Sequence, residues 1–524
     1  TGTGRHLYWV LGKGASMTDQ QLPETLKEQV DRNAQMRGDT VWLISPETGE
    51  EVSFAQAQTR IVEIAAHLSG LGLKEGASVA IAAPNSIGSC LMFMGAVYAG
   101  FVAVPLNLVA GPAIIGYTLR HCEAELIFVA DECKELIESA QGEEGLKLRT
   151  MRLDLEKGPV WESPAKTVSS PFHPSSQTIG LLMYTSGTTG KPKGVMLSHA
   201  NLLAAGRYIS SGHAITENDR ALCVLPIYHI NGLCVTVMGT LVSASTLVMP
   251  YRFSVSTFWE TIVRYACSWF SAVPTQYAYI LNNDAPVGDL SHLRFARSAS
   301  APLSPDIHRR FEERFKVPII ETMGLTETGS QITTNPLPPA ERKIGSPGAA
   351  YGNEIMVADA EFAAVPTGQT GEILVRGKNV MQGYFKQPDE TAKTITKDGW
   401  LRTGDLGYMD EDGFIYVSGR IKELIIKGGE NIAPREIDEA LLEHPSILEA
   451  AAFAVPCENY GERVEACIRF KDKADVGIDV LMAHCVSKLG KFKSPDQIHV
   501  MEDLPKGPSG KVQRLKLYGM IYAA

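Results

Sequence analysis

The segment YTSGTTGKPKG at residues 184–194 combines small hydroxyl side chains, glycines and two lysines, which are residue types that hold a phosphate group. Glycines let backbone N–H groups approach an anion closely, serine and threonine hydroxyls add hydrogen-bond donors, and lysines add positive charge. The segment is not a Walker A loop, because G-x-x-x-x-G-K-[ST] would need glycine where Pro192 stands. On composition alone, a surface turn fits this segment as well as a phosphate-binding loop.

Three later motifs carry polar residues that a nucleotide site needs beside such a loop. ETMGLTET at residues 321–328 has Glu327 in a predicted turn, where its carboxylate can bind a hard cation such as Mg²⁺. GWLRTGDLG at residues 399–407 has Asp405 in a predicted turn, as an acceptor for the two hydroxyls of a ribose. LPKGPSGKVQR, near the end of the chain, contributes Lys511. Taken singly, a helix-capping carboxylate, a turn residue and a solvated lysine explain the same three residues.

The hydrophobic pattern predicts the elements that hold these motifs. The apolar run at residues 178–184 predicts a buried strand before the glycine-rich loop, and Ser198 is suited to cap a helix that begins near His199. Asp412 and Gly413 lie between apolar runs, which is typical of a hairpin turn. Strand-like runs alternate with helical patterns through most of the N-terminal two thirds, so we expect an α/β fold of mixed sheets flanked by helices.

The pattern of predicted strands and helices changes near Arg420 and divides the chain into two parts. Beyond Arg420, about a hundred residues carry their own strands and an amphipathic helix at residues 433–445, which is enough for a small α+β domain. We therefore expect a large N-terminal domain at residues 17–421 and a C-terminal domain at residues 422–524. Residues 1–16 do not resemble a signal peptide, and we interpret them as a vector-derived remnant.

Composition narrows the class of protein. The chain has 524 residues, 44% of them hydrophobic, and a formal net charge of −10, which argues against nonspecific binding to nucleic acid. Its nine cysteines show no C-x-x-C spacing, so we expect free thiols, no structural zinc and a cytoplasmic location. A monomer and a dimer are both compatible with the sequence.

One stretch raises the alternative of a membrane span, because no charged residue occurs from Gly76 to Leu119. It predicts a strand at residues 77–83, a helix at 87–99 and a strand at 101–105, and each is too short to cross a bilayer. The interrupting residues are Pro84, Asn85, Pro105 and Asn107. We therefore expect a buried α/β core here.

Together and in this order, the motifs resemble the adenylate-forming superfamily, which contains acyl-CoA synthetases, the adenylation domains of nonribosomal peptide synthetases and firefly luciferase. The resemblance extends from about Leu22 to about Leu517. It implies an AMP-forming acid–CoA ligase: MgATP activates a carboxylate to an acyl adenylate, pyrophosphate leaves, and the thiol of CoA then gives acyl-CoA and AMP. It also implies that the C-terminal domain is a mobile lid hinged at Lys422.

The resemblance assigns a role to each motif residue. Catalysis is implied for Lys511, Glu327, Thr326 and His229, and Mg²⁺ binding for Glu327 and Thr185. ATP or AMP binding is implied for Thr185, Ser186, Gly187, Thr188, Thr189, Gly190, Lys193, Ser300, Ala301, Pro302, Glu321, Thr322, Met323, Asp405 and Arg420. CoA binding is implied for Gly428, Gly429 and Glu430. The acyl pocket is expected to include His229, Asn231, Trp269, Ser271, Val273, Pro274, Arg297, Ser298 and Gly324.

Two of these positions qualify the resemblance. Met323 replaces the aromatic residue that usually stacks on adenine, so we expect looser ATP binding, although methionine is apolar and adaptable. His229 is implied to lie beside the carboxylate and to gate the CoA tunnel, and a hydrogen-bonded histidine at a strand end is the alternative.

The pocket residues indicate the kind of acid. Bulky Trp269, with Ser298 and Ser300 as donors, predicts a short pocket with polar ends, and the segment SWFSAVPTQYAYIL resembles ligases for oxalate and other small acids. We expect a small polar carboxylate, such as oxalate or sulfoacetate. A second anionic group would need a cationic partner, for which Arg297 and Arg252 are candidates, and a surface salt bridge is the alternative role for either arginine.

Other functions of the same fold stay open. A stand-alone adenylation domain that loads a carrier protein is one, and a ligase for medium-chain or aromatic acids is another. Luciferase-like oxygenation and a noncatalytic nucleotide sensor are less consistent with the sequence. KGGEN at residues 427–431 resembles the CoA ligases, and Lys511, Glu327 and Asp405 all stand in place.

Overall fold

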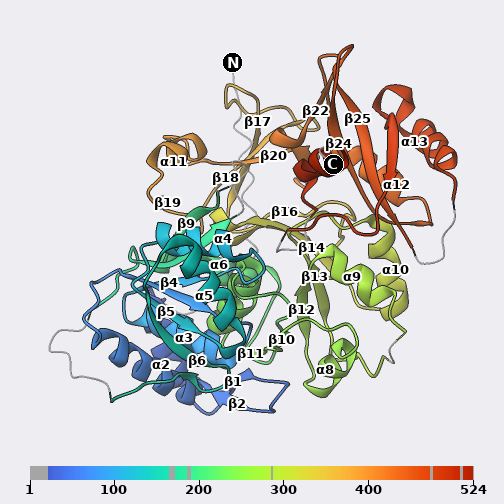
Figure 1. The fold of residues 1–524 in the computed structure, drawn as a ribbon. Helices are drawn as coiled ribbons and strands as arrows, with labels where there is room; N and C mark the ends of the chain where they lie inside the picture. Colours follow the sequence, from blue (N-terminus) through green and yellow to red (C-terminus); the bar gives the residue numbers. More distant parts are fainter. Residues whose placement is uncertain are drawn as a thin grey trace, which may run out of the picture.

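The computed structural model describes residues 22–164, 172–185, 191–284, 287–471, 476–507 and 512–522. A large body contains two sheets and their helices, a third sheet lies beside them, and the C-terminal segment forms a smaller upper part (Figure 1). Residues 1–16, the loop at 186–190 and Lys511 lie outside the described residues, so the predictions for them are not tested by the structure.

The first sheet has a parallel centre that is buried on both faces. Its strands follow the order β19-β9-β8-β4-β3-β5-β6-β7, and β8, β4, β3, β5 and β6 pair in parallel. The strands are β3 (Ser78–Ala82), β4 (Val102–Pro105), β5 (Leu126–Val129), β6 (Arg149–Asp154), β7 (Gly158–Pro159), β8 (Ile179–Thr185), β9 (Lys193–Ser198) and β19 (Gly383–Tyr384). Strands covered on both faces read as apolar runs, which explains the uncharged stretch.

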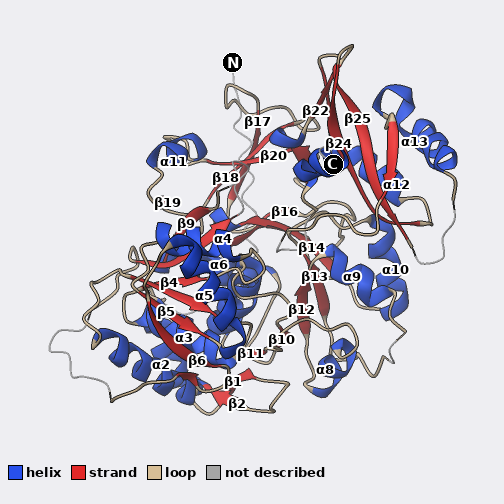
Figure 2. Cartoon of the chain, in the orientation of Figure 1, coloured by secondary structure: helices blue, strands red, loops and turns tan. Residues whose placement is uncertain are grey.

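Helices cover this sheet on its two faces (Figure 2). They are α1 (Leu26–Arg37), α2 (Phe54–Ser69), α3 (Ile87–Tyr98), α4 (Pro112–His121), α5 (Lys134–Glu144) and α6 (His199–Gly212). Every residue of α3 from Ile87 to Val97 is buried, so this helix is a core helix rather than a membrane span. Within the described ranges, no helix is long and apolar enough to cross a membrane.

A strand that the sequence analysis did not predict lies between the glycine-rich segment and the helix at His199. Lys193–Ser198 forms β9, which pairs antiparallel with β8. The apolar residues Val195 and Leu197 explain this strand, because both are buried against the core. The predicted cap is confirmed: the Oγ of Ser198 accepts a hydrogen bond from the backbone N–H of Asn201, and α6 begins at His199.

The second sheet carries most of the predicted site. Its strands follow the order β16-β15-β14-β13-β12-β10-β11-β1-β2. They are β1 (Val41–Ile44), β2 (Glu51–Ser53), β10 (Arg220–Leu222), β11 (Thr246–Val248), β12 (Trp269–Ala272), β13 (Phe295–Ser298), β14 (Ile319–Leu325), β15 (Ser330–Thr334) and β16 (Ala349–Ala350). Its helices are the π-helical η2 (Asn231–Met238), α7 (Gly239–Ser243), α8 (Phe258–Arg264), α9 (Pro274–Leu281) and α10 (Pro305–Phe315).

The third sheet is antiparallel and contains β17 (Glu354–Ala358), β18 (Gly371–Arg376), β20 (Leu401–Met409) and β21 (Ile415–Arg420). Helix α11 (Pro388–Thr394) precedes β20. The predicted hairpin is confirmed, because β20 and β21 flank Asp412 and Gly413. Gly413 has φ of 82°, a left-handed conformation that glycine adopts without steric cost.

The C-terminal segment builds its own sheet and hydrophobic cores. The strands β22 (Ile425–Lys427), β23 (Glu430–Ile432), β24 (Ile447–Cys457), β25 (Gly461–Phe470) and β26 (Gln497–Val500) carry helices α12 (Pro434–Leu442) and α13 (Ile478–Lys493) on one face. The turn η5 (Arg514–Lys516) and α14 (Leu517–Tyr522) pack against β24. The α/β fold class is therefore confirmed, whereas the hinge at Lys422 and the exact domain bounds stay predictions.

Candidate active site

A cavity of about 90 Å³ lies where the second and third sheets meet. The end of β13, the strand β14, the middle of β20 and the strand β21 supply most of its wall, so residues far apart in sequence converge on it. Its lining residues are Ser298, Ser300, Ala301, Pro302, Glu321, Thr322, Met323, Gly324, Gly345, Pro347, Asp405, Val417, Arg420 and Arg435. Most of the nucleotide-binding residues predicted outside the glycine-rich loop therefore gather around one cavity.

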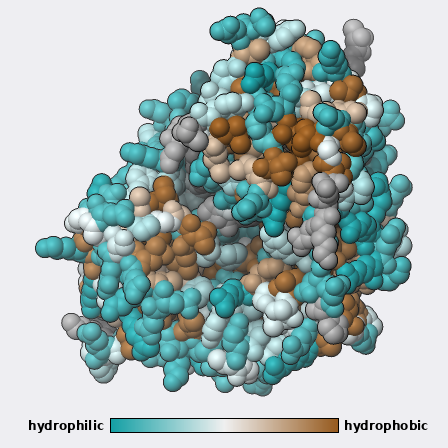
Figure 3. Space-filling view, turned by 45° about the vertical axis from the view of Figure 1, so that its right-hand side comes forward, coloured by the Kyte–Doolittle hydropathy of each residue, from teal (hydrophilic) through white to brown (hydrophobic). Residues whose placement is uncertain are grey.

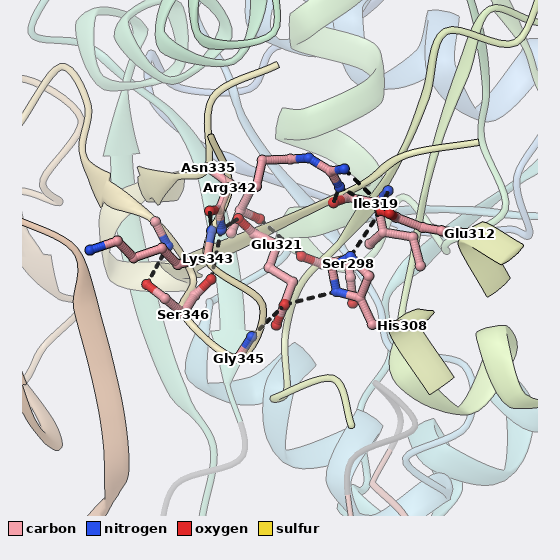
Figure 4. A network of polar contacts seen from close by, with 12 residues as sticks. Ser298, His308, Glu312, Ile319, Glu321, Asn335, Arg342, Lys343, Gly345 and Ser346 are labelled. Atoms are coloured by element: carbon pink, nitrogen blue, oxygen red, sulfur yellow. Dashed lines mark hydrogen bonds and ion pairs between the residues drawn. The ribbon is translucent and has the colours of Figure 1, made fainter. Parts of the chain in front are cut away.

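Glu321 lines this cavity, and a network of polar contacts holds its carboxylate in position (Figure 4). Its Oε1 accepts hydrogen bonds from the backbone N–H of Gly345 at 2.9 Å and from Nδ1 of His308 at 3.0 Å. The other ring nitrogen of His308 lies 2.9 Å from Oε1 of Glu312, and Arg342 binds the same carboxylate. His308 therefore lies between two carboxylates and is only 2% exposed.

The charges of this network are consistent with its geometry. Burial alone would lower the pKa of His308, but the hydrogen bonds to Glu312 and Glu321 outweigh burial and raise it. Burial would raise the pKa of Glu312, but bonds from His308, Arg342 and a backbone N–H lower it to about 2. An imidazolium with both N–H groups donating fixes the Glu321 carboxylate at the edge of the cavity.

Asp405 and Arg420 form an ion pair beside the same cavity. Nε of Arg420 lies 2.7 Å from Oδ1 of Asp405, and this carboxylate raises the pKa of the guanidinium. The prediction that Asp405 lies in a turn is wrong, because it lies within β20. The strand continues through Asp405 since β20 pairs with β18 on one side and with β21 on the other, and Asp405 is opposite Arg420 in that pairing.

Glu327 lies in the short turn η3 (Thr326–Thr328), as predicted, and is half-buried together with Thr326. Its Oε1 accepts a hydrogen bond of 2.8 Å from Oη of Tyr384. The ring of Tyr384 also lies 4.9 Å from Nζ of Lys193, which pairs with Glu390 at 2.5 Å. The Lys193 partner lowers the pKa of Glu390 to about 2.

The glycine-rich loop itself lies outside the described residues, including Ser186, Gly187, Thr188, Thr189 and Gly190. Its two ends are described: Thr185 ends β8 and pairs with Lys193 at the start of β9. The hairpin therefore brings Thr185 and Lys193 opposite each other at the base of the loop.

The predicted acyl pocket contains a polar cluster at the start of η2. Asn231 donates from Nδ2 to Oγ of Ser300 at 3.1 Å, and its Oδ1 accepts from Oγ of Ser271 at 3.0 Å and from Nη1 of Arg297 at 3.2 Å. π-Helical turns are frequent at functional sites. Ser300 has φ of 74°, a strained conformation for serine, and it lines the 90 Å³ cavity. The cluster therefore connects Arg297 to the cavity wall.

The other residues predicted for the acyl pocket differ in burial and in whether they line a cavity. Trp269, two positions before Ser271 on β12, is fully buried and stacks on Phe295. Ser298 lines the cavity, and its Oγ has no hydrogen-bond partner among the described residues. Gly324 lines the cavity as well, and His229 lies in the turn before η2.

A second cavity of about 250 Å³ lies between the body and the C-terminal part. It shares Ala301, Pro302, Asp405, Val417, Arg420 and Arg435 with the first cavity, so the two adjoin. Val273 and Pro274 line this second cavity, as do Glu423, Val512 and Arg514. The space-filling view shows a hollow between the two parts of the molecule, with apolar residues gathered on the upper part beside it (Figure 3).

Gly428 and Gly429 form the turn between β22 and β23, and Glu430 begins β23. In the part of the chain that the structure describes, none of the three lines either cavity. Lys511 lies outside the described residues. Its neighbour Val512 lines the larger cavity, and Arg514 binds Asp438 of α12 at 2.6 Å. The chain on one side of Lys511 therefore faces the cavities, whereas the glycine pair does not.

Sequence reasoning missed several residues of the site: His213, His308, Gln331, Tyr384 and Glu390. They stand outside the quoted motifs, and their roles depend on long-range contacts such as His308 with Glu321. One usable signal was GYFKQPDET at residues 383–391, where an aromatic residue and two acidic residues follow a glycine.

Comparisons with known proteins agree with this geometry. The family described as "AMP-binding enzyme" matches residues 30–385, and "AMP-binding enzyme C-terminal domain" matches residues 436–511. The chain therefore belongs to the adenylate-forming acyl-CoA synthetase family.

Named relatives of this adenylate-forming enzyme are CoA ligases. It is 44% identical to the sulfoacetate–CoA ligase of Cupriavidus necator, covering 95% of this chain and 98% of that protein. It is 34% identical to the oxalate–CoA ligase of Arabidopsis thaliana, covering 85% of this chain and 89% of that one. The protein is an acid–thiol ligase, and its relatives support the AMP-forming acid–CoA class.

Among solved structures, ATP-bound MatB from Rhodopseudomonas palustris has a TM-score of 0.87 with 28% sequence identity, covering 96% of this chain and all of that one. The apo structure of the same protein has a lower TM-score of 0.76 over the same shares of the two chains. Over the whole chain, the present structure is thus more similar to the ATP-bound form of that relative than to its apo form.

Proposed function

We propose that this protein is an AMP-forming ligase that joins a small polar carboxylic acid to CoA. One observation carries the proposal: Glu321, Asp405 and Arg420, from two different sheets, converge on one 90 Å³ cavity that adjoins the larger cleft. The smaller cavity takes the adenosine part of ATP, with Asp405 on the ribose, Met323, Glu321 and Thr322 around the base, and Arg420 on the nucleotide.

In the first half-reaction the carboxylate of the acid attacks the α-phosphate, and the P–O bond to pyrophosphate breaks. Negative charge grows on the transferred group, so a preorganised cation lowers the barrier. Lys511 supplies that cation, and the loop from Thr185 to Gly190 with Lys193 holds the leaving phosphates. Lys193 leaves Glu390 when it does so, because the two now form a 2.5 Å ion pair.

The donor set around Glu327 fits Mg²⁺. Tyr384 occupies one oxygen of the Glu327 carboxylate and leaves the other for a cation that keeps most of its coordination for water and phosphate oxygens, and the hydroxyls of Thr185 and Thr326 would add to this set. Bound there, Mg²⁺ would neutralise charge on the leaving phosphates. Tyr384 orients the carboxylate for this role.

The second half-reaction needs the CoA thiol at the acyl carbon instead of Lys511. Residues 422–524 form the lid, and residues 17–421 form the adenylation domain. Rotation of the lid at Lys422 moves Lys511 away from the site and lets the CoA thiol enter. Rotation brings Gly428, Gly429 and Glu430 to the pantetheine path, which His229 gates. Two observations support this step: Val512 faces the cleft while the glycine pair does not, and the ATP-bound relative fits better than its apo form.

The acid is small and polar. Ser298 and Ser300 give the cavity wall polar atoms, Asn231 and Ser271 extend this polar cluster behind Ser300, and Trp269 is fully buried on the same strand as Ser271. Two relatives named for sulfoacetate and oxalate act on acids that carry two acidic groups, which supports the same class here. Carrier-protein loading and activation of medium-chain or aromatic acids are the competing functions. We also propose a cytoplasmic location, on the basis of the cysteine pattern.

A panel of carboxylic acids with MgATP tests the proposal. Pyrophosphate release is measured with and without CoA, for oxalate, sulfoacetate, acetate, octanoate and benzoate. We expect one of the small dianions to give the highest kcat/KM and to consume CoA to a thioester. Higher kcat/KM for octanoate or benzoate would refute the small-acid assignment, and pyrophosphate release without consumption of CoA would favour a carrier protein as acceptor.

A further inference from the structure

Arg297 is a fully buried cation one residue before Ser298, which lines the 90 Å³ cavity. It has 0% exposure and lies on β13, where it is opposite Ser271 of the parallel strand β12. Paired residues of neighbouring parallel strands project from the same face of a sheet. The side chains of Arg297 and Ser271 therefore share the face on which Asn231 lies, and hydrogen bonds among the three confirm this.

The hydrogen bonds of Arg297 leave part of its capacity unused. Nε donates to Nε2 of His213 at 3.2 Å, and Nη1 donates to Oγ of Ser271 at 3.0 Å and to Oδ1 of Asn231. Nη2 reaches Oε1 of Gln331 only at 3.5 Å, the long limit for a hydrogen bond. A guanidinium has five N–H groups, so one N–H of Nη2 has no acceptor in the described part of the chain.

None of these partners carries a negative charge. No carboxylate of the described residues lies within ion-pair distance of Arg297, and burial together with the nearby arginines lowers the pKa of His213 to about 3, which keeps it neutral. Burial lowers the pKa of Arg297 itself to about 9, so the guanidinium is charged at neutral pH. A buried charge without a counter-ion is costly, and proteins retain such groups where function requires them.

We propose that Arg297 binds a second anionic group of the acid substrate and thereby selects dianionic acids. The proposal rests on the ligase function proposed above and deepens it by naming the residue that sets the substrate class. The substrate supplies the missing negative charge. The N–H of Nη2 that has no acceptor can donate to the anionic group, and the long contact to Gln331 can be replaced by it. Asn231 and Ser300 connect this cation to the nucleotide cavity, so the reacting carboxylate lies one short spacer away.

The geometry also decides between the two arginines considered from the sequence. Arg252 is exposed, whereas Arg297 is buried and hydrogen-bonded to Asn231 and Ser271. An exposed guanidinium is hydrated and screened by salt, so it discriminates weakly between substrates. Arg252 therefore serves as the matched control.

The experiment compares isosteric acids that differ by one negative charge: oxalate against oxamate, and sulfoacetate against methylsulfonylacetate. Binding to the full-length protein in the presence of AMP is measured by calorimetry for the wild type, Arg297→Met and Arg252→Met. We expect the wild type to prefer at least one dianion over its partner by about 100-fold, Arg297→Met to reduce that preference to nearly equal binding, and Arg252→Met to keep it.

A second readout separates recognition from a merely structural role. Arg297→Met removes a buried charge that lacks a counter-ion, but it also removes the donor of several buried hydrogen bonds, so we expect the melting temperature to change by no more than a few degrees. Affinity for AMP should also be unchanged.

Three results would overturn the proposal: a wild type that prefers neither dianion, an unchanged preference in Arg297→Met, or an equal loss of affinity for both members of a pair with a lower melting temperature. Because binding is measured without turnover, these results stand apart from the pyrophosphate and thioester assays. If the selectivity for dianions depends on Arg297 but the protein never consumes CoA, the proposed role of Arg297 stands and only the proposed ligase function is rejected.

Discussion

Oη of Tyr384 donates a hydrogen bond of 2.8 Å to Oε1 of Glu327, and this contact joins β19 to the turn η3. Burial and the nearby carboxylate of Glu327 raise the pKa of Tyr384, so the phenol stays protonated and keeps donating. The contact leaves the other oxygen of Glu327 for a cation. Tyr384 thus orients a proposed Mg²⁺ ligand without binding the ion itself.

Tyr384→Phe removes the hydroxyl that bonds to Glu327 and retains the ring that faces Lys193. We expect the Mg²⁺ concentration for half-maximal pyrophosphate release to rise by about 10-fold, the range typical of residues that orient a metal ligand. Glu327→Ala removes the ligand and should raise the requirement further. Tyr416→Phe is the control, because Tyr416 stacks on Tyr408 away from both cavities and should not change the titration. An unshifted curve for Tyr384→Phe would reject the orienting role.

Lys511→Ala separates the two half-reactions. We expect pyrophosphate release to fall by at least about 100-fold, because a cation that stabilises the transition state is lost. Thioester formation from presupplied acyl adenylate should be retained, because that step proceeds with Lys511 displaced. Lys491→Ala removes an exposed lysine of α13 and should affect neither step. Normal adenylation by Lys511→Ala would show that another group stabilises the charge.

The sequence predicted the strands and helices that local pattern controls. The apolar runs around β3, β4 and β8 were recognisable because both faces of these strands are buried, and the Ser198 cap was recognisable from its residue type. Asp405 was misjudged because its glycine neighbours indicate a turn, while pairing with two strands keeps the segment extended. Local propensity loses to such tertiary pairing.

The site was predicted in part for a related reason. Motif residues such as Glu321 and Asp405 could be named from the resemblance, but the groups that orient them could not. His308 becomes significant only when α10 packs against β14, and Tyr384 only when β19 pairs with β9. The role of Arg297 depended on burial, which separates it from Arg252.

Gly324→Ala tests how closely β14 and β15 approach. A Cβ at Gly324 would lie 1.8 Å from the carbonyl oxygen of Ser330, a backbone atom that cannot move without shifting β15. We expect a melting temperature lower by several degrees and loss of adenylation, because Thr326 and Glu327 follow directly. Gly142→Ala is the control: it lies in α5 with nothing within 4 Å, so helix propensity should keep or raise the melting temperature. Equal stability of the two variants would contradict the close packing.

His308→Gln tests the network behind the nucleotide cavity through its pH dependence. The pKa of His308 in the folded protein is raised above its ordinary value of 6.5, so its contribution to stability is full below about pH 6.5 and is lost as the pH rises through the folded value. Glu312, with its pKa lowered to about 2, contributes above about pH 4.5 and loses that contribution only as the pH falls towards 2. The contacts among His308, Glu312 and Glu321 therefore stabilise the fold most between these limits.

We expect the melting temperature of His308→Gln to fall below that of the wild type by several degrees at pH 6, and by clearly less at pH 9. His173→Gln changes an exposed histidine and should show no difference at either pH. A deficit in His308→Gln that is the same at pH 6 and pH 9 would mean that His308 contributes by packing rather than as an imidazolium held between two carboxylates.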